Sequence, residues 1–350
     1  MTTVNEASSS EPSPNELSAM RHAIALASQG LGTTSPNPVV GAVILDAQGA
    51  VVGEGYHQIA GGPHAEVLAL AQAAESARGG TAVVTLEPCS TTGRTGPCTA
   101  ALIAAGVHRV VYAVSDPTSA GGGADVVRAA GIEVQGGVLT DEAAQGNEAW
   151  LHAVTTGRPF VVWKSAVTLD GRVAAADGTS RWITGEAARA DVHLLRSQLD
   201  AVVVGSGTAL TDDPELTVRD AGGRPQERQP LRVVLDRSGR VPVTARVRNT
   251  AGPSLVVHAG DAAEALATLY ERGIRSVLLE GGPRVSAAFM AAGLVDKVVC
   301  YIAPALLGEG PGALAPFGVG SIEGARRFRI DEVRLIGEDV KVVAYPREGG

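Results

Sequence analysis

The 350-residue sequence is poor in aromatic residues, in cysteine and in positive charge. Aromatic side chains make up 3% of the chain, and acidic residues outnumber basic ones, so the formal net charge is −8. This balance argues against a surface that binds nucleic acid or anionic membranes broadly. Three cysteines, Cys89, Cys98 and Cys300, are too few for a disulfide framework and favour a reducing cytoplasm.

Long apolar runs and a secretory signal are missing as well. No apolar stretch approaches the length of a membrane span. The first residues, MTTVNEASSSEPSPNE, lack a basic segment followed by an apolar core. Their serine, proline and glutamate content predicts a disordered tail over residues 1–14. We therefore expect neither membrane insertion nor export.

Strands and helices alternate along the rest of the chain, which predicts an α/β fold with two domains and largely parallel sheets. The first helix is capped by Ser13, with Pro14 in its first turn and Glu16 completing a capping box. A hairpin turns at 47–49, and further helices are predicted over 63–77, 97–105, 124–130 and 141–152. Gly157-Arg158-Pro159 is the candidate boundary, so we expect domains over residues 15–155 and 156–350. Helices in the second domain are predicted over 186–197, 261–272 and 284–292.

Two of the cysteines lie downstream of a His-x-Glu motif, in GGPHAEVLAL and TLEPCSTTGRTGPC. His64, Cys89 and Cys98 offer one nitrogen and two sulfurs to a zinc ion. A fourth position stays free for water, as in catalytic zinc sites, and zinc lowers the pKa of bound water to about 7. Residues two apart on a helix face different ways. Glu66 is therefore a candidate proton shuttle beside the metal rather than a ligand.

Two other interpretations of these residues stay open. The thiols could be ordinary buried cysteines, or the site could be a structural zinc site with His57 as its fourth ligand. The placement favours catalysis, because His64 and Cys98 each follow a proline at the start of a predicted helix. Helix N-termini stabilise thiolates.

A His-x-Glu motif followed by Pro-Cys and a second cysteine is the signature of zinc deaminases. In that signature two residues usually separate the cysteines, whereas eight residues separate Cys89 and Cys98 here. With SPNPVVGAVILD and ALIAAGVHRVVYAVSDP, this half resembles the deaminase half of the bifunctional riboflavin-biosynthesis deaminase–reductases. The resemblance implies a cytidine-deaminase-like α/β/α domain that releases an exocyclic amine from a diaminopyrimidine ribosyl phosphate. The family commonly has His at Thr91 and Pro at Gly96, and neither position is a metal ligand.

Two polar residues near this motif have open assignments. Asn37, in TSPNPVVG, matches the family's pyrimidine-contacting loop, where an amide can both donate and accept hydrogen bonds. It also suits a turn between two prolines. Arg94, between the cysteines, either meets a substrate phosphate or stays solvated.

The second half carries another set of polar loops. KSAVTLDGRVAAADGTSRWITG begins at Lys164 after an apolar strand, where sites tend to lie. LLEGGPRVSAAF runs from a strand through Gly281 and Gly282 into a helix, a turn that suits the phosphates of a dinucleotide. The Rossmann pattern is absent, since GSGTAL has Leu210 where a third glycine is needed. By itself a Gly-Gly turn before a helix is weak evidence, because most such turns are structural.

Together these stretches resemble the reductase half of the same family, which has a dihydrofolate-reductase-like α/β fold and uses NADPH. The resemblance implies substrate contacts at Ser180, Arg196, Leu216, Arg219 and Glu280. It implies NADPH contacts at Ala166, Trp182, Thr208 and Asp212, and at the turn and helix start Gly282, Pro283, Arg284, Val285, Ser286, Ala287 and Ala288.

These residue types suit the reduction of a ribosyl phosphate, whose sugar must open and accept hydride at C1′. Lys164 and Asp170 are candidate catalytic groups that orient the sugar or handle its proton. Arg196 and Arg219 could hold the phosphate in a bidentate manner, and Trp182 could pack against the nicotinamide ring. Each also has an ordinary interpretation, such as a turn aspartate, a helix-face arginine or a core tryptophan.

The sequence therefore predicts a cytoplasmic enzyme for a small phosphorylated pyrimidine, with zinc and NADPH as cofactors. We expect a homodimer or higher homo-oligomer formed through the reductase half. A nucleic-acid base deaminase would instead need a basic face with aromatic residues. A module that only binds zinc or a nucleotide would not need Glu66 beside a three-ligand metal set.

Overall fold

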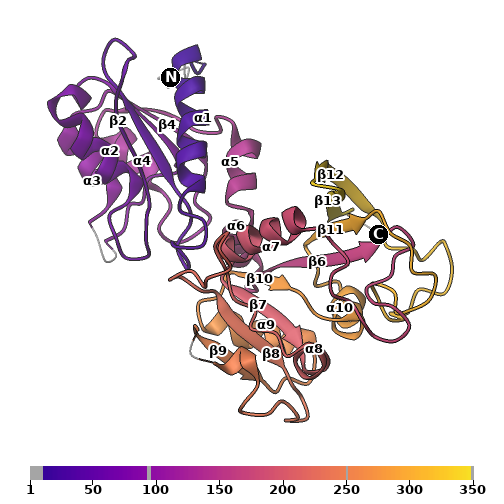
Figure 1. Ribbon diagram of the computed structural model, residues 1–350. Helices are drawn as coiled ribbons and strands as arrows, with labels where there is room; N and C mark the ends of the chain where they lie inside the picture. The colour runs from indigo at the N-terminus through magenta and orange to yellow at the C-terminus, as the bar shows by residue number, and fades with distance from the viewer. Residues whose placement is uncertain (1–10, 93–95, 250, 348–350) are drawn as a thin grey trace. The chain divides into compact units, whose positions relative to one another are not determined.

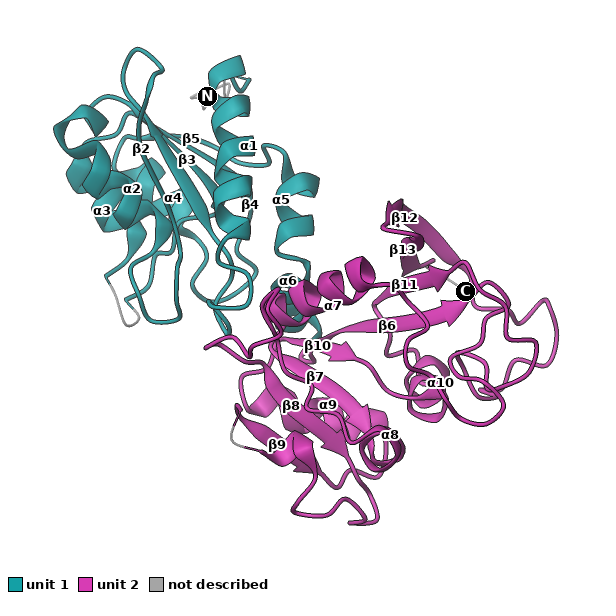
Figure 2. Ribbon diagram, in the orientation of Figure 1, with its two compact units in different colours: residues 1–156 teal, residues 157–350 magenta. Residues whose placement is uncertain are grey.

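A computed structural model of the chain describes residues 11–92, 96–249 and 251–347. Helices and strands alternate along most of the chain (Figure 1), and the chain divides into two compact units, residues 1–156 and 157–350 (Figure 2). The first ten residues of the predicted disordered tail lie outside the described residues. Helix α1 (Pro14–Ser28) already begins at Pro14, and Ser13 and Glu16 form both bonds of the predicted capping box. Within the described ranges, no helix combines the length and the apolar character needed to cross a bilayer.

The first unit is built on a five-stranded sheet in the order β2-β1-β3-β4-β5. β1 pairs antiparallel with β2 and β3, whereas β3, β4 and β5 pair in parallel. The sheet is therefore mixed and not largely parallel as predicted, because β1 runs opposite to both of its neighbours, β2 and β3. Its strands are β1 (Gly41–Leu45), β2 (Val51–Tyr56), β3 (Thr81–Leu86), β4 (Arg109–Val114) and β5 (Glu133–Gln135).

Helices cover both faces of this sheet, which confirms the predicted α/β/α architecture. One face packs on α2 (Ala65–Ala73), α3 (Cys98–Ala105) and α4 (Gly123–Ala129), with a 3-10 turn, η1 (Ala74–Ala77), between α2 and β3. The other packs on α1, α5 (Thr140–Gly146) and α6 (Glu148–Thr156). The single helix predicted over 141–152 is wrong. It is divided at Asn147, whose buried amide accepts from the Val39 N–H and donates to the Val39 carbonyl.

The second unit is built on an eight-stranded sheet in the order β12-β13-β11-β6-β10-β7-β8-β9. The pairings from β11 through β9 are parallel, and β13 and β12 are added antiparallel. Strand β12 was not predicted. Its sequence, FRIDEVRLI, is rich in charged residues, and most of its side chains are exposed, so it lacks the apolar pattern of a buried strand. The strands are β6 (Phe160–Thr168), β7 (Ala201–Gly205), β8 (Leu231–Leu235), β9 (Ser254–Val257), β10 (Ser276–Leu279), β11 (Lys297–Ala303), β12 (Phe328–Ile336) and β13 (Asp339–Pro346).

The helices of this unit connect the parallel strands. They are α7 (Glu186–Gln198), α8 (Ser206–Asp212), α9 (Ala262–Glu271) and α10 (Pro283–Ala291), with a 3-10 turn η2 (Arg246–Arg248). α9 and α10 bury their apolar sides against one face of the sheet. Because β6, β10 and β7 are parallel neighbours, the loops at their carboxyl ends meet at one edge, where ligands of open α/β sheets bind.

Candidate active sites

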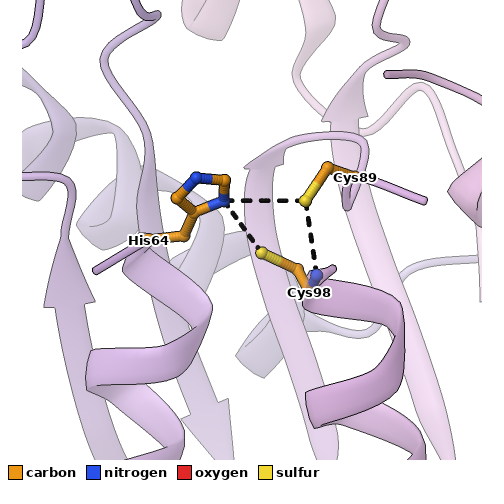
Figure 3. A group of neighbouring side chains, drawn as sticks. All are labelled: His64, Cys89 and Cys98. Atoms are coloured by element: carbon orange, nitrogen blue, oxygen red, sulfur yellow. Dashed lines mark hydrogen bonds between the residues drawn. The ribbon is translucent and has the colours of Figure 1, made fainter. Parts of the chain in front are cut away.

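His64, Cys89 and Cys98 come together in the first unit although the chain separates them by up to 34 residues. The His64 Nδ1 atom lies 3.1 Å from Cys98 Sγ and 3.6 Å from Cys89 Sγ. Figure 3 shows the imidazole nitrogen and the two sulfurs turned toward one another. Among the described residues, these three form the one group of potential metal ligands, with donor atoms within 4.8 Å of one another.

Local structure brings each ligand to this point. His64 is the N-cap of α2, and Cys98 is the first residue of α3, as predicted. Cys89 lies on the turn that follows β3, and its sulfur accepts a hydrogen bond of 3.3 Å from the Cys98 backbone N–H. Two helix N-termini and a strand end therefore converge, and both helix starts favour negative charge.

The donor set fits zinc. Tetrahedral zinc bound by an imidazole and a thiolate separates the nitrogen and sulfur by about 3.6 Å, and both observed distances lie within about half an ångström of this value. A hydrogen bond with Cys98 lowers the pKa of the Cys89 thiol to about 4, and the same contact raises the pKa of Cys98. A dication bound between the two sulfurs would favour the thiolate form of both cysteines.

Glu66 and a pocket lie beside the three ligands. The side chain of Glu66 is 3% exposed, and burial raises its pKa. A pocket of about 400 Å³ opens here, lined by His64, Glu66 and Cys89 and by Asn37 from the loop before β1. Two of the predicted metal ligands, the predicted proton shuttle and the predicted pyrimidine contact therefore line one cavity, whereas Cys98 is fully buried. Arg94, the other predicted contact, lies outside the described residues.

The hydrogen bonds of His57 define the orientation of Asn37. His57 Nδ1 lies 3.0 Å from the Pro63 carbonyl, which can only accept, so Nδ1 carries the proton. Burial lowers the pKa of His57, so its Nε2 is the acceptor for the Asn37 amide nitrogen at 3.2 Å. Both ring nitrogens are used, and His57 is not the fourth metal ligand of the structural alternative. Asn37 keeps its carbonyl oxygen and one N–H for a ligand.

Glu87 is a supporting residue that sequence reasoning missed. Its buried carboxylate accepts from the backbone N–H groups of Asp116, at 3.2 Å, and Ala124, at 3.0 Å. A Cβ at Gly123 would lie 1.8 Å from the Pro88 carbonyl, so only glycine fits there. The hydrogen bonds of Glu87 therefore hold the loop 116–123, which lines the pocket, against the turn that carries Cys89. The polar stretch SDPTS after β4 could have indicated from the sequence that this loop belongs to the site.

Lys164, Glu280 and Arg196 form a charged cluster in the second unit. Arg196 binds Glu280 in a bidentate manner, with Nε to Oε1 at 2.6 Å and Nη2 to Oε2 at 3.0 Å. The Lys164 Nζ atom lies 3.9 Å from Glu280 Oε2. Burial opposes ionisation of Glu280, but Arg196 and Lys164 outweigh it and lower its pKa to about 2. Burial lowers the pKa of Lys164.

The segment that carries Leu216 and Arg219 packs on α7, beside this cluster. Arg196 Nη1 donates to the Thr217 carbonyl at 3.0 Å, and the Arg219 N–H donates to His193 Nδ1 at 3.3 Å. Leu216 has φ of 56°, a left-handed conformation that is unusual for leucine. Arg219 itself binds Glu215, and its side chain remains 35% exposed. The structure thus brings together four predicted substrate contacts, Arg196, Leu216, Arg219 and Glu280.

Asp170 is engaged in holding a loop. Its carboxylate accepts from the Thr168 hydroxyl at 2.5 Å and from the backbone N–H groups of Gly308, at 2.7 Å, and Leu307. The Thr168 bond is the main reason that the pKa of Asp170 falls to about 2. Asp170 therefore anchors the loop after β11, a role that its turn sequence could not reveal.

The predicted cofactor residues flank the start of α10. Gly282 is its N-cap and donates to the Thr208 hydroxyl at 3.1 Å, which joins the starts of α8 and α10. Pro283 is the first helical residue, Arg284 and Ala288 are exposed, and Ser286 and Ala287 are buried. The sequence predicted this helix to begin one residue later. Within the stretch, a ligand would therefore meet backbone and exposed positions rather than the buried side chains.

The remaining predicted contacts lie on β6, on the loop after it and at the end of α8. Ala166 is half-buried on β6, and Ser180 is half-buried on the loop after it. Trp182 is 70% exposed, with the Arg189 guanidinium 4.7 Å from its ring centroid, so it is not a core tryptophan. Asp212 ends α8, and its carbonyl accepts from the Arg181 side chain at 2.7 Å.

Two protein-family models match the chain, one in each unit. Residues 14–114 match the cytidine and deoxycytidylate deaminase zinc-binding region, and residues 159–342 match the RibD C-terminal domain. Both matches agree with the fold classes predicted from the sequence.

Named relatives cover nearly the whole chain. The chain is 47% identical to the riboflavin biosynthesis protein RibD of Mycobacterium tuberculosis, over 92% of this chain and 95% of that protein. It is 42% identical to RibD of Escherichia coli, over 92% and 96%.

Solved structures agree in fold. RibD of Acinetobacter baumannii superposes with a TM-score of 0.88 at 40% identity and covers 95% of this chain and 99% of its own. A diaminohydroxyphosphoribosylaminopyrimidine deaminase/5-amino-6-(5-phosphoribosylamino)uracil reductase of Thermotoga maritima gives 0.88 at 36% identity, with the same coverage. The chain therefore belongs to the RibD family and is a bifunctional enzyme of riboflavin biosynthesis, with a zinc-dependent deaminase domain and an NADPH-dependent reductase domain.

Proposed function

We propose that residues 15–155 deaminate 2,5-diamino-6-ribosylamino-4(3H)-pyrimidinone 5′-phosphate and that residues 156–350 reduce the ribosyl group of the product to ribityl. The observation that carries the first assignment is that two members of the His64, Cys89 and Cys98 group, His64 and Cys89, line a pocket together with Glu66 and Asn37. In this scheme His64, Cys89 and Cys98 hold the zinc ion, which supplies the Lewis acidity that makes water a nucleophile at neutral pH.

Glu66 and Asn37 have separate tasks in the deamination. Asn37, fixed by His57, presents a carbonyl oxygen and an N–H to the edge of the pyrimidine. Glu66 takes a proton from the attacking water and delivers one to the exocyclic amine. A carbon–oxygen bond forms, the carbon–nitrogen bond breaks, and ammonia leaves.

The reductase assignment rests on the cluster around Glu280. NADPH, which supplies the hydride, would lie along the starts of α8 and α10, with Ala166, Trp182, Thr208, Asp212 and the stretch 282–288 around it. Lys164, next to the Glu280 carboxylate, donates to the sugar and handles the proton of ring opening. The substrate contacts in this proposal are Ser180, Arg196, Leu216, Arg219 and Glu280. Asp170 acts through the loop that it holds.

The Lys164→Ala variant should lose most of its reductase activity and keep its deaminase activity, because Lys164 and the zinc ligands lie in different units. We expect kcat for NADPH oxidation to fall about 10²-fold or more. If Lys164 only bound substrate, KM would rise instead. The measurement is NADPH oxidation with deaminated substrate, next to ammonia release with the diamino substrate.

A matched lysine provides the control. Lys297→Ala removes a lysine from the neighbouring strand β11 and should keep both activities. Loss of ammonia release in a well-folded Lys164→Ala protein would show that the two sites are coupled. Normal NADPH oxidation in that variant would remove Lys164 from the mechanism.

The apolar face of β12 supports assembly into a homo-oligomer through the reductase unit. Ile330, Val333 and Leu335 are 62%, 59% and 74% exposed on this strand. Apolar patches of this kind mark protein contact sites. Leu335→Glu should therefore shift the mass measured by light scattering toward the monomer. A monomeric wild type, or a variant of unchanged mass, would argue against this interface.

We place the enzyme in the cytoplasm. Its three cysteines are free thiols, and the two in the pocket must stay reduced to bind a metal.

A further inference from the structure

Helix α7 begins without a capping side chain of its own. Its N-cap residue is Gly185, whereas serine, threonine, aspartate and asparagine are the usual capping residues. The Gly185 backbone N–H instead donates to Asp339 Oδ2 at 2.8 Å, across 154 positions of the sequence. Asp339 is the first residue of β13 and is 2% exposed. A buried carboxylate from another strand therefore satisfies a donor at this helix end and places negative charge where helix N-termini favour it.

The contact between Gly185 and Asp339 is close. A Cβ at position 185 would lie 3.3 Å from Asp339 Oδ2, tighter than an ordinary van der Waals contact. Asp339 pairs with Ile336 across the turn between β12 and β13, where Gly337 has φ of 61°. The pairing of the two strands thus fixes the carboxylate, and glycine at the start of α7 leaves room for it.

The segment that ends at Gly185 carries the exposed Trp182. The Arg189 guanidinium, on α7, lies 4.7 Å from the centroid of the Trp182 ring, and Arg189 Nη1 donates to the Thr184 carbonyl at 2.7 Å. One side of the indole therefore faces the helix, although the residue as a whole is 70% exposed. The position of the ring depends on where α7 begins and on how its first turn is held.

The body of α7 has a separate anchor. The Asp191 carboxylate accepts from the Tyr301 hydroxyl on β11 at 2.5 Å and from Lys341 Nζ on β13 at 2.8 Å. These bonds hold the middle of the helix on the sheet without Asp339. Loss of the Asp339 carboxylate should therefore loosen the segment before α7 and leave the helix in place.

We infer that Asp339 is a positioning residue of the proposed cofactor site, which caps α7 from β13 and thereby holds the segment 181–185 with Trp182 in place for NADPH. The inference rests on the proposed function of Trp182 as a cofactor contact. Asp339 itself touches neither cofactor nor substrate in this account. A segment that is ordered before binding lowers the entropy cost of holding a ligand.

The first experiment measures the affinity of the full-length zinc-loaded Asp339→Ala protein for NADP⁺ by calorimetric titration. We expect the dissociation constant to rise about five- to tenfold, the factor that corresponds to a lost helix cap. The KM for NADPH should rise with it. NADP⁺ affinity equal to that of the wild type in a folded Asp339→Ala protein would overturn the inference.

A conservative variant separates the hydrogen bond from the charge. In Asp339→Asn the side-chain carbonyl can still accept from the Gly185 N–H, so NADP⁺ affinity should stay within about twofold of the wild type. A loss as large as that of Asp339→Ala would show that the charge acts on the ligand and would contradict a capping role. Glu338→Ala removes an exposed carboxylate from the same turn and should bind NADP⁺ normally.

Tryptophan fluorescence reports the predicted loosening directly. Trp150 and Trp163 are each 8% exposed, so Trp182 is the tryptophan free to move on the nanosecond timescale. The fast component of the anisotropy decay should grow in Asp339→Ala, and this growth should be absent when Trp182→Phe is added. A weaker affinity for NADP⁺ without a change in this component would contradict positioning through Trp182.

Hydrogen exchange in the wild type gives an answer even if Asp339→Ala does not fold. An N-cap N–H has no partner within its own helix, yet that of Gly185 donates to a buried carboxylate. It should therefore exchange slowly with solvent. Fast exchange of the Gly185 amide would contradict the inference.

The Trp182→Ala variant keeps this test distinct from that of the proposed site. If Trp182→Ala binds NADP⁺ normally, the proposed cofactor contact is wrong. If Trp182→Ala binds weakly while Asp339→Ala binds normally, only the inference about Asp339 is wrong. If both bind weakly, Asp339→Ala should add no more than about twofold in the Trp182→Ala background. Losses that multiply would show that Asp339 has a separate task and would overturn the inference.

Discussion

Replacement of Cys98 by serine is expected to remove zinc and to abolish ammonia release. Cys98 is fully buried at the start of α3, and its sulfur lies 3.1 Å from His64 Nδ1. A serine hydroxyl is not ionised at neutral pH and cannot replace a thiolate as a zinc ligand. The ion would then keep only His64 and Cys89 as protein ligands. Metal analysis of the purified protein should find about one zinc per chain in the wild type and much less in the variant.

The third cysteine supplies the control for this prediction. Cys300→Ser removes a half-buried thiol from β11 in the other unit and should leave the zinc content and ammonia release unchanged. Full zinc content together with full deaminase activity in Cys98→Ser would refute the metal assignment. Loss of zinc in Cys300→Ser as well would show that the thiols act through stability instead of coordination.

The Glu66→Gln variant should lose deamination by about 10²-fold or more while it keeps its zinc. Glutamine has nearly the same shape as glutamate and can replace it in the wall of the pocket, but it cannot carry a proton from water to the leaving amine. The measurement is the rate of ammonia release, with zinc content determined on the same sample. NADPH oxidation with already deaminated substrate should be normal, because the reductase residues lie in the other unit.

A glutamate at the end of the same helical segment is the comparison. Glu75 lies exposed in η1, away from the pocket lining, and Glu75→Gln should deaminate normally. Near-normal ammonia release from Glu66→Gln would remove Glu66 from the mechanism. Loss of zinc from that variant would mean that Glu66 supports the ligands, and its role would be structural.

The deaminase site could be predicted closely because short segments carry it. His64 and Cys98 stand at helix starts that their preceding prolines mark, and Glu66 follows its ligand by two residues. Local sequence defines these positions. The pairing of Asn37 with His57 required the tertiary structure, because the two residues come from different loops and share a hydrogen bond that no spacing reveals.

The reductase site was harder to predict because its side chains are defined by distant partners. Asp170, a predicted catalytic group, accepts hydrogen bonds from the backbone of Leu307 and Gly308, which lie far along the chain. Arg196, a predicted phosphate ligand, also forms a bidentate ion pair with Glu280, which the sequence spacing does not reveal. Strand β12 was missed because its charged residues hide the alternation, and the helix at Asn147 was divided by a bond to Val39.

The most direct test of the whole account is to identify the products by mass after the purified protein acts on the diamino substrate, with and without NADPH. Without NADPH, the product should have exchanged one amine for oxygen, with an equal amount of ammonia released. With NADPH, the same product should also gain two hydrogens, with an equal amount of NADPH oxidised. An unchanged pyrimidine in both reactions, or a product that keeps its ribosyl group when NADPH is present, would contradict the assignment of two activities to this chain.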